Sequence, residues 1–145
     1  MSGCLVDTNI ISEIRRNERA DGGVLAWFNT EPEAGMFLSV MTLGEIRKGI
    51  ELLLHRDLSQ AQVLNFWLLQ LERRFSGKIL PVTTAIADRW GRMLAIRPLP
   101  QVDALLAATA QEHDLTLVTR NENDFAGLGI RVFNPFLNQE NKPGI

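Results

Sequence analysis

Short apolar runs alternate with longer amphipathic stretches along the whole of this 145-residue chain. Apolar runs of this length are typical of buried strands, and the amphipathic stretches are typical of surface helices. Strands that alternate with helices pair in parallel, and the helices then cover both faces of the sheet. The sequence therefore predicts an α/β protein, a single α/β/α sandwich with a five-stranded, mostly parallel central sheet. The expected strands are 3–6, 36–40, 79–82, 115–119 and 130–133.

Polar residues that can cap a helix indicate where several of the helices begin. Asp21 precedes one amphipathic stretch, Thr42 begins another, and a long helix is expected to follow Ser59 and to end at Gly77. The alanine-rich segment 103–113 predicts a further helix, because alanine has the highest intrinsic helix propensity.

The composition is that of an ordinary soluble domain, with 46% hydrophobic and 22% charged residues. The net charge of -2 gives no overall attraction to nucleic acid, so RNA binding would require a local basic patch. The one cysteine, Cys4, excludes an intramolecular disulfide and a cysteine-rich zinc site, and it is expected to be buried. The sequence has no membrane-span-length apolar stretch and no signal-peptide pattern, so we expect a cytoplasmic protein without membrane association.

Acidic and amide residues occur where strands end and helices begin. Asp7 ends the first strand, Glu45 and Asp103 lie near helix starts, and Asn121 and Asp124 follow the fourth strand. In an open parallel sheet these positions meet at the carboxyl edge, so the side chains can converge. A cluster of carboxylates without basic partners is costly unless divalent cations neutralise it. The pattern therefore predicts a magnesium- or manganese-dependent enzyme that acts on phosphates.

Most of the acids also have an ordinary structural explanation. Glu45 follows Thr42 at the spacing of a capping box, Asp103 can complement a helix dipole, and Asp124 can be a turn residue. Asp7 is harder to explain in this way, because an unpaired acid after a buried strand is costly to desolvate. One metal site accounts for all of these positions together.

Four motifs occur in order along the chain: VDTN at 6–9, TLGE at 42–45, VDALLA at 102–107 and LVTRNENDF at 117–125. With the closing VFNPF at 132–136, they resemble the PIN-domain ribonucleases, and within them the FitB-like branch of the VapC-type toxins. The resemblance covers nearly the whole chain. It implies a PIN-like nuclease domain over 1–136 that is usually dimeric, followed by a polar tail, 137–145.

The resemblance also implies roles for individual residues. Asp7, Glu45, Asp103 and Asp124 are expected to be catalytic and to bind Mg²⁺ or Mn²⁺. Asn121 is an alternative for the fourth ligand position, which stays open between Asn121 and Asp124. Supporting polar contacts are expected from Thr8, Asn9 and Thr119, and contacts to the RNA backbone from Arg15, Arg47 and Arg120.

The function implied by the resemblance is that of a metal-dependent endoribonuclease, the toxin of a toxin–antitoxin pair, in which metal-activated water hydrolyses RNA phosphodiester bonds. Its expected partners are a cognate antitoxin, a second copy of the chain, and operator DNA through the antitoxin only. The apolar faces of the helix that carries Glu45 and of the helix over 59–75 are the expected surfaces for contact with the antitoxin or the second copy.

The alternative to this enzymatic function is a catalytically weak PIN-like domain that acts mainly as a protein-binding module. A haloacid-dehalogenase-like phosphatase is disfavoured, because it needs an aspartate where this chain has Asn9.

Overall fold

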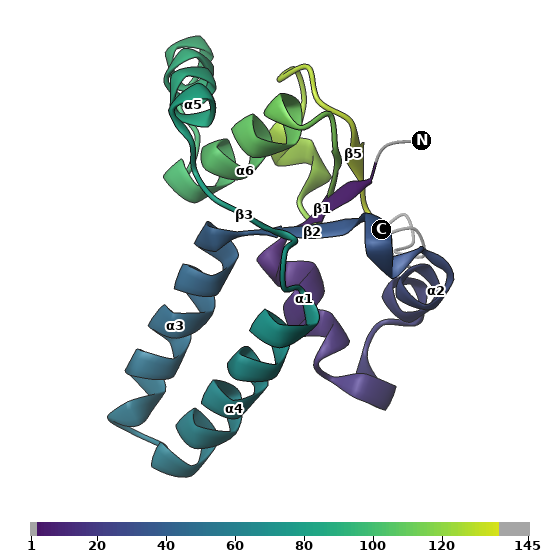
Figure 1. Ribbon diagram of the computed structural model, residues 1–145, viewed down its shortest axis with the longest axis vertical. Helices are drawn as coiled ribbons and strands as arrows, with labels where there is room; N and C mark the ends of the chain where they lie inside the picture. Colours follow the sequence, from purple (N-terminus) through teal and green to yellow (C-terminus); the bar gives the residue numbers. More distant parts are fainter. Residues whose placement is uncertain (1–2, 137–145) are drawn as a thin grey trace, which may run out of the picture.

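A five-stranded parallel sheet forms the centre of the molecule in the computed structural model, which describes residues 3–136 (Figure 1). The strands lie in the order β3-β2-β1-β4-β5, and every neighbouring pair is parallel. The predicted α/β class and all five predicted strands are therefore confirmed, while the predicted polar tail lies outside the described residues. The strands are β1 (Cys4–Val6), β2 (Met36–Ser39), β3 (Ile79–Leu80), β4 (Thr116–Val118) and β5 (Val132–Phe133).

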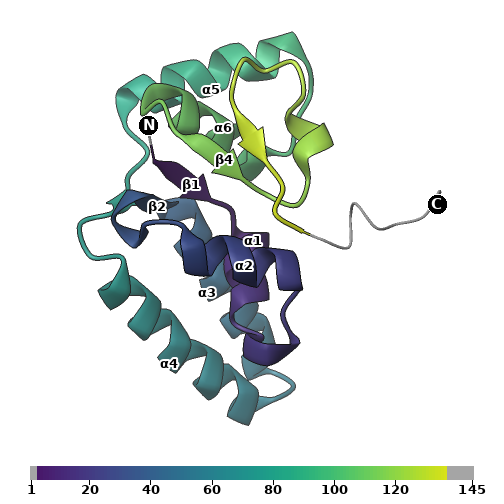
Figure 2. The ribbon, with the colours of Figure 1, turned by 90° about the vertical axis from the view of Figure 1, so that its right-hand side faces the viewer.

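Helices cover both faces of the sheet, as Figures 1 and 2 show from two directions. One face carries α1 (Thr8–Ile14), α2 (Gly22–Thr30), α3 (Val40–Leu54) and α4 (Leu58–Arg74). The other face carries α5 (Thr84–Ile96) and α6 (Gln101–Glu112). Short 3₁₀ turns, which the sequence did not predict, form η1 (Asn17–Arg19), η2 (Glu33–Gly35) and η3 (Glu122–Phe125). Within residues 3–136, no helix combines the length and the apolar character needed to cross a membrane.

The strand order reverses direction at the centre of the sheet. From β1 the chain builds outward through β2 to β3, and it then returns to place β4 on the other side of β1. In open parallel sheets, ligands bind outside the carboxyl ends of the strands at such a switch point. The strand order therefore predicts a ligand site next to the segments that follow β1 and β4.

Alternate residues of β1 belong to different halves of the core, as the two-residue period of a strand requires. Cys4 and Val6 pack with α1 to α4, whereas Leu5 packs with α5 and α6. The expected burial of Cys4 is confirmed: the residue is 8% exposed, and burial raises the pKa of its thiol to about 12. Strands buried on both sides explain why the apolar runs were nearly continuous in the sequence.

Two predicted helix starts are wrong by a few residues. Helix α3 begins at Val40, two residues before Thr42, because the Ser39 hydroxyl caps it by accepting a 3.0 Å hydrogen bond from the Met41 N–H. Helix α4 begins at Leu58, because Asp57 rather than Ser59 is its capping residue. The predicted cap at Asp21 is confirmed by its bond of 2.9 Å from the Gly23 N–H.

The expected strand ranges are longer than those observed. Pairing of β3 ends at Leu80 instead of continuing to Val82, because the next residue, Pro81, has no N–H to donate to the ladder. The remaining differences are of one or two residues at strand ends, and they leave the register between neighbouring strands unaffected.

Candidate active site

The four predicted acids lie at the carboxyl edge of the sheet, around the switch point. Asp7 directly follows β1, Glu45 lies in the second turn of α3, Asp103 in the first turn of α6, and Asp124 in η3. Asp103 and Glu45 both raise the pKa of Asp7, while Asp124 and Glu45 raise the pKa of Asp103. The fold therefore brings Asp103 within electrostatic reach of the other three carboxylates.

Asp7 is the most buried member of this group, with 5% of its surface exposed. Its Oδ1 accepts a 2.6 Å hydrogen bond from the Thr8 N–H, and its Oδ2 accepts a 2.7 Å bond from the Thr119 hydroxyl. Desolvation outweighs both hydrogen bonds and, together with the charges of Asp103 and Glu45, raises the pKa of Asp7 from 3.8 to about 6. Asp7 is therefore a carboxylate that the protein alone stabilises poorly in its charged form.

Thr119 is fully buried and directs its hydroxyl hydrogen at Asp7. Its Oγ1 accepts the Asn121 N–H at 3.1 Å and the Asn9 amide at 3.4 Å, which occupies its acceptor positions and leaves the hydrogen for Asp7 Oδ2. The Asn9 amide also lies 3.4 Å from Asp7 Oδ2, and its Oδ1 accepts the Arg120 N–H at 3.2 Å. Asn9 and Thr119 thus connect the segments after β1 and β4.

Glu45 is held from the neighbouring segment rather than by its own helix start. The Thr8 hydroxyl donates a 2.5 Å hydrogen bond to Glu45 Oε1 and also lies 3.2 Å from the hydroxyl of Thr42. Since Ser39 caps α3, Glu45 takes no part in a capping box, and that explanation of the residue is wrong. Its exposed carboxylate is available to the site.

Asp103 and Asp124 form the outer part of the site. Asp103 is partly buried in the first turn of α6, where a carboxylate also complements the helix dipole. Burial, followed by the charge of Asp124, raises the pKa of Asp103. Asp124 is exposed within η3, and Asn121, also exposed, occupies the residue before this turn.

Arg97 holds η3 in place through a contact that no sequence pattern predicted. Its guanidinium donates hydrogen bonds of 2.8 Å to the Asp124 carbonyl and 3.0 Å to the Ala126 carbonyl. Arg97 follows α5, in the connection that leads to Asp103. It therefore ties the segment before one acid to the turn that carries another.

The acids lack cationic partners, because no ion pair within residues 3–136 joins Asp7, Glu45, Asp103 or Asp124 to lysine or arginine. Carboxylate oxygens are the ligands that a hard divalent cation prefers, so the residue types fit Mg²⁺ or Mn²⁺. The described side chains do not yet form a complete site, since no three of their Asp, Glu, His or Cys groups are arranged to hold an ion.

The three arginines predicted to contact RNA lie in different surroundings. The Arg15 guanidinium lies over the Trp67 ring, 5.5 Å from its centroid, whereas Arg47 lines a groove of about 320 Å³ between α3 and α4. The Arg120 guanidinium lies 4.5 Å from the centroid of the Phe136 ring. Of the three, Arg120 is the one whose backbone also contacts the Asp7 network, through Asn9.

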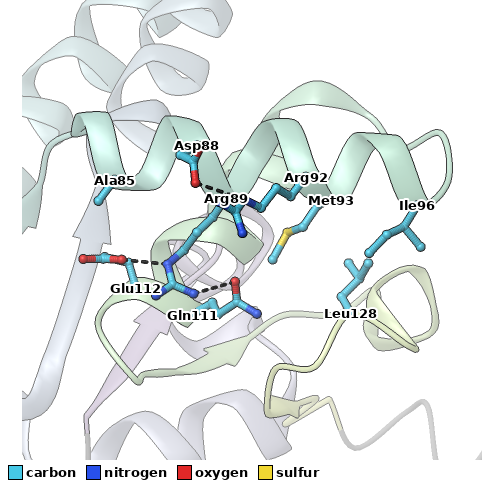
Figure 3. A pocket seen from close by; sticks show the side chains of 9 residues that line it. All are labelled: Ala85, Asp88, Arg89, Arg92, Met93, Ile96, Gln111, Glu112 and Leu128. Atoms are coloured by element: carbon cyan, nitrogen blue, oxygen red, sulfur yellow. Dashed lines mark hydrogen bonds and ion pairs between the residues drawn. The ribbon is translucent and has the colours of Figure 1, made fainter.

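A pocket of about 470 Å³ lies between α5, the end of α6 and Leu128, and it contains none of the predicted site residues (Figure 3). Its charged side chains pair with one another: Arg89 contacts Glu112 at 2.6 Å, and Arg92 contacts Asp88 at 3.0 Å. The charges in the pocket are thus compensated, unlike those of the acidic edge, which we define as Asp7, Glu45, Asp103 and Asp124.

Comparison with known proteins identifies the family to which the chain belongs. The family model described as "PIN domain" matches residues 4–130. The protein named Toxin FitB from Neisseria gonorrhoeae is 34% identical over 91% of this chain and 97% of its own length. The crystal structure of FitAcB from Neisseria gonorrhoeae superimposes with a TM-score of 0.81 and 31% identity, covering 91% of this chain and 97% of that one. A protein named VapC ribonuclease Y4jK from Sinorhizobium fredii is 27% identical over 91% of this chain and 96% of its own. The chain belongs to the PIN-domain family.

Proposed function

We propose that the protein is a Mg²⁺- or Mn²⁺-dependent endoribonuclease that hydrolyses RNA phosphodiester bonds. The observation that carries the proposal is Asp7, a 5% exposed carboxylate whose charged form is disfavoured by burial and by the charges of Asp103 and Glu45. A protein that maintains such charge without a cationic partner gains from binding a divalent cation. The ribonuclease name of the Sinorhizobium fredii relative supports RNA as the substrate.

Asp7 and Asp103 would hold the ion, with Glu45 and Asp124 completing the site and Asn121 as the alternative to Asp124. A bound divalent ion supplies Lewis acidity, which polarises a phosphodiester and lowers the pKa of water. The Thr119 hydroxyl keeps Asp7 Oδ2 oriented, and the Thr8 hydroxyl keeps Glu45 Oε1 oriented. The contact with Thr119 also favours the ionised form of Asp7, because a hydrogen bond to the charged form stabilises it.

The biological setting that we propose is a toxin–antitoxin pair, supported by the relative named Toxin FitB. The partner would be a small antitoxin, and operator DNA would be bound through that antitoxin, as the structure of FitAB bound to an IR36 DNA fragment suggests. That structure superimposes with a TM-score of 0.80 and 30% identity. We further propose a homodimer that acts on RNA in the cytoplasm.

Cleavage of a mixed RNA pool tests the proposal. The purified, antitoxin-free protein is incubated with Mg²⁺, with Mn²⁺ or with EDTA, next to the variants Asp7→Asn and Asp103→Asn. Asp88→Asn is the matched control, because Asp88 is an exposed acid that pairs with Arg92 away from the acidic edge. We expect cleavage by the wild type and by Asp88→Asn with either metal, and none with EDTA or in the two site variants.

Absence of cleavage by folded, metal-supplied wild type would overturn the enzymatic proposal. It would favour the alternative, a catalytically weak domain that acts mainly by binding its antitoxin. Cleavage that persists in EDTA would contradict the metal dependence while leaving a ribonuclease.

A further inference from the structure

Arg120 follows Thr119, the residue whose hydroxyl bonds Asp7, and its guanidinium lies on an aromatic ring. The guanidinium carbon is 4.5 Å from the centroid of Phe136, which is only 3% exposed. Phe136 packs into the core on the α1 to α4 side of the sheet. The guanidinium of the exposed Arg120 thus packs on the ring of the buried Phe136, which is a favourable cation–π arrangement.

The backbone of Arg120 is fixed on both sides as well. Its N–H donates to Asn9 Oδ1 at 3.2 Å, and its carbonyl accepts a 3.3 Å bond from Asn134 Nδ2. Asn134 Oδ1 in turn accepts the Phe136 N–H at 2.9 Å. Asn134 therefore links the backbone of the arginine to the turn that supplies its ring, and both ends of the Arg120 side chain have a fixed support.

Within residues 3–136, no hydrogen bond involves the Arg120 guanidinium, so its donors are available to a ligand. Stacking uses the face of the planar group and leaves its N–H edges accessible. In the described part of the chain, no carboxylate pairs with Arg120, whereas Arg16, Arg89 and Arg131 each pair with an acid. The acidic site beside Arg120 repels a polyanion, so a substrate gains from an unpaired cation at this position.

We propose that Arg120 binds an RNA phosphate adjacent to the one that is cleaved, and that Phe136 is the positioning residue that holds its guanidinium. The inference rests on the proposed ribonuclease function and assigns one contact with its substrate. Arginine suits this role because its fork of donors matches a phosphate in bidentate geometry. Preorganisation on Phe136 reduces the conformational entropy lost when RNA binds.

Steady-state cleavage of a single-stranded RNA by Arg120→Ala, Phe136→Leu and the double variant tests the inference. Leucine retains an apolar side chain in the core but has no aromatic face. We expect Arg120→Ala to raise KM about tenfold and Phe136→Leu to raise it about threefold, both with kcat close to wild type. The double variant is expected to match Arg120→Ala alone, because Phe136 acts through Arg120.

Binding without cleavage provides a second readout, measured by fluorescence anisotropy with each variant in the Asp7→Asn background. We expect Arg120→Ala to reduce the slope of log affinity against log salt concentration by about 0.7, the value for one phosphate contact with a single strand. Arg73→Ala, which removes an exposed arginine at the end of α4, is the matched control and is expected to change neither KM nor the slope. Thermal unfolding establishes that each variant is folded, and Phe136→Met replaces Phe136→Leu if the latter is not.

An unchanged KM in Arg120→Ala, in a preparation whose wild type cleaves RNA, would overturn this inference and leave the proposed function intact. Additive effects of the two substitutions, or a normal KM in a destabilised Phe136→Leu, would show that the stacking is purely structural. Failure of the wild type to cleave any RNA would instead overturn the proposed function.

Discussion

The Thr119 hydroxyl donates a 2.7 Å hydrogen bond to Asp7 Oδ2, which joins residues 112 positions apart at the centre of the sheet. The bond depends on the pairing of β1 with β4, which aligns Val6 with Val118 and places the next residue of each strand at the carboxyl edge. It counteracts the desolvation of Asp7, since a hydrogen bond to the charged form lowers a carboxyl pKa.

The substitution Thr119→Val removes the hydroxyl whose hydrogen bond lowers the pKa of Asp7. It is therefore expected to raise this pKa further above 6 and to weaken Mn²⁺ binding at neutral pH. We also expect the free energy of unfolding to fall by about 1–3 kcal/mol, because the Asn121 N–H loses its acceptor. Calorimetric titration with Mn²⁺ and urea unfolding measure the two effects. Thr119→Ser, which keeps the hydroxyl, is expected to behave nearly as wild type, and equal weakening in both variants would contradict this role.

Asp7→Asn is expected to stabilise the protein while abolishing cleavage. The folded-state pKa of Asp7, about 6, lies above the unfolded value of 3.8, so folding favours the protonated acid. The contribution of this residue to stability is therefore greatest at low pH and is lost as the pH rises from about 4 to about 6. At pH 7 the cost is on the order of 3 kcal/mol in the wild type, and asparagine avoids it.

Urea unfolding of metal-free wild type and Asp7→Asn across this pH range measures the effect. The stability difference in favour of Asp7→Asn is expected to grow with pH and to level off above pH 6. Added Mn²⁺ is expected to raise the unfolding midpoint of the wild type but not of Asp7→Asn. If Asp7→Asn is less stable than wild type at pH 7, the buried charge of Asp7 does not destabilise the folded protein.

Asp124 is expected to contribute more to metal binding than Asn121. After burial, the charge of Asp124 is the main cause of the raised pKa of Asp103, so the two carboxylates interact electrostatically. We expect Asp124→Asn to weaken Mn²⁺ binding about tenfold, and Asn121→Ala to have a smaller effect, both measured by calorimetric titration. The reverse order would assign the fourth ligand position to Asn121.

Arg97 is expected to influence the site through the backbone of η3. In Arg97→Ala the carbonyls of Asp124 and Ala126 lose hydrogen bonds of 2.8 and 3.0 Å, so the turn is expected to open more often. The expected results are faster amide hydrogen exchange in η3 and a loss of about 1 kcal/mol in stability. Arg97→Lys retains the charge, so we expect it to lose less stability than Arg97→Ala. Unchanged amide hydrogen exchange in Arg97→Ala would show that η3 is held by other contacts.

The runs of apolar residues were sufficient to predict the sheet, because the central strands β1, β2 and β4 are mostly buried and appear as nearly uninterrupted apolar runs. Helix starts were less predictable where two capping residues compete. Ser39 and Asp57 cap α3 and α4, although Thr42 and Ser59 lie close by and have side chains of the same capability. The short 3₁₀ turns have no periodic pattern of their own and depend on tertiary contacts such as those of Arg97 with η3.

The positions of the acids could be predicted because strand ends and helix starts lie at one edge of a parallel sheet. The side chains that support them could not, since their contacts cross long stretches of sequence. The bond from Thr8 to Glu45 joins residues 37 apart, and the bond from Arg97 to Asp124 joins residues 27 apart. No local pattern distinguishes Phe136 as the support of Arg120 from any other buried phenylalanine.

The burial of Cys4 has a practical consequence for labelling experiments. It is the one thiol of the chain, and a pKa of about 12 keeps it protonated and unreactive toward alkylating reagents at neutral pH. A cysteine introduced at an exposed position therefore becomes a unique attachment point for a fluorophore or spin label, with the native residue left in place. Paired labels on η3 and α3 would report the distance across the acidic edge as a divalent ion or RNA is added.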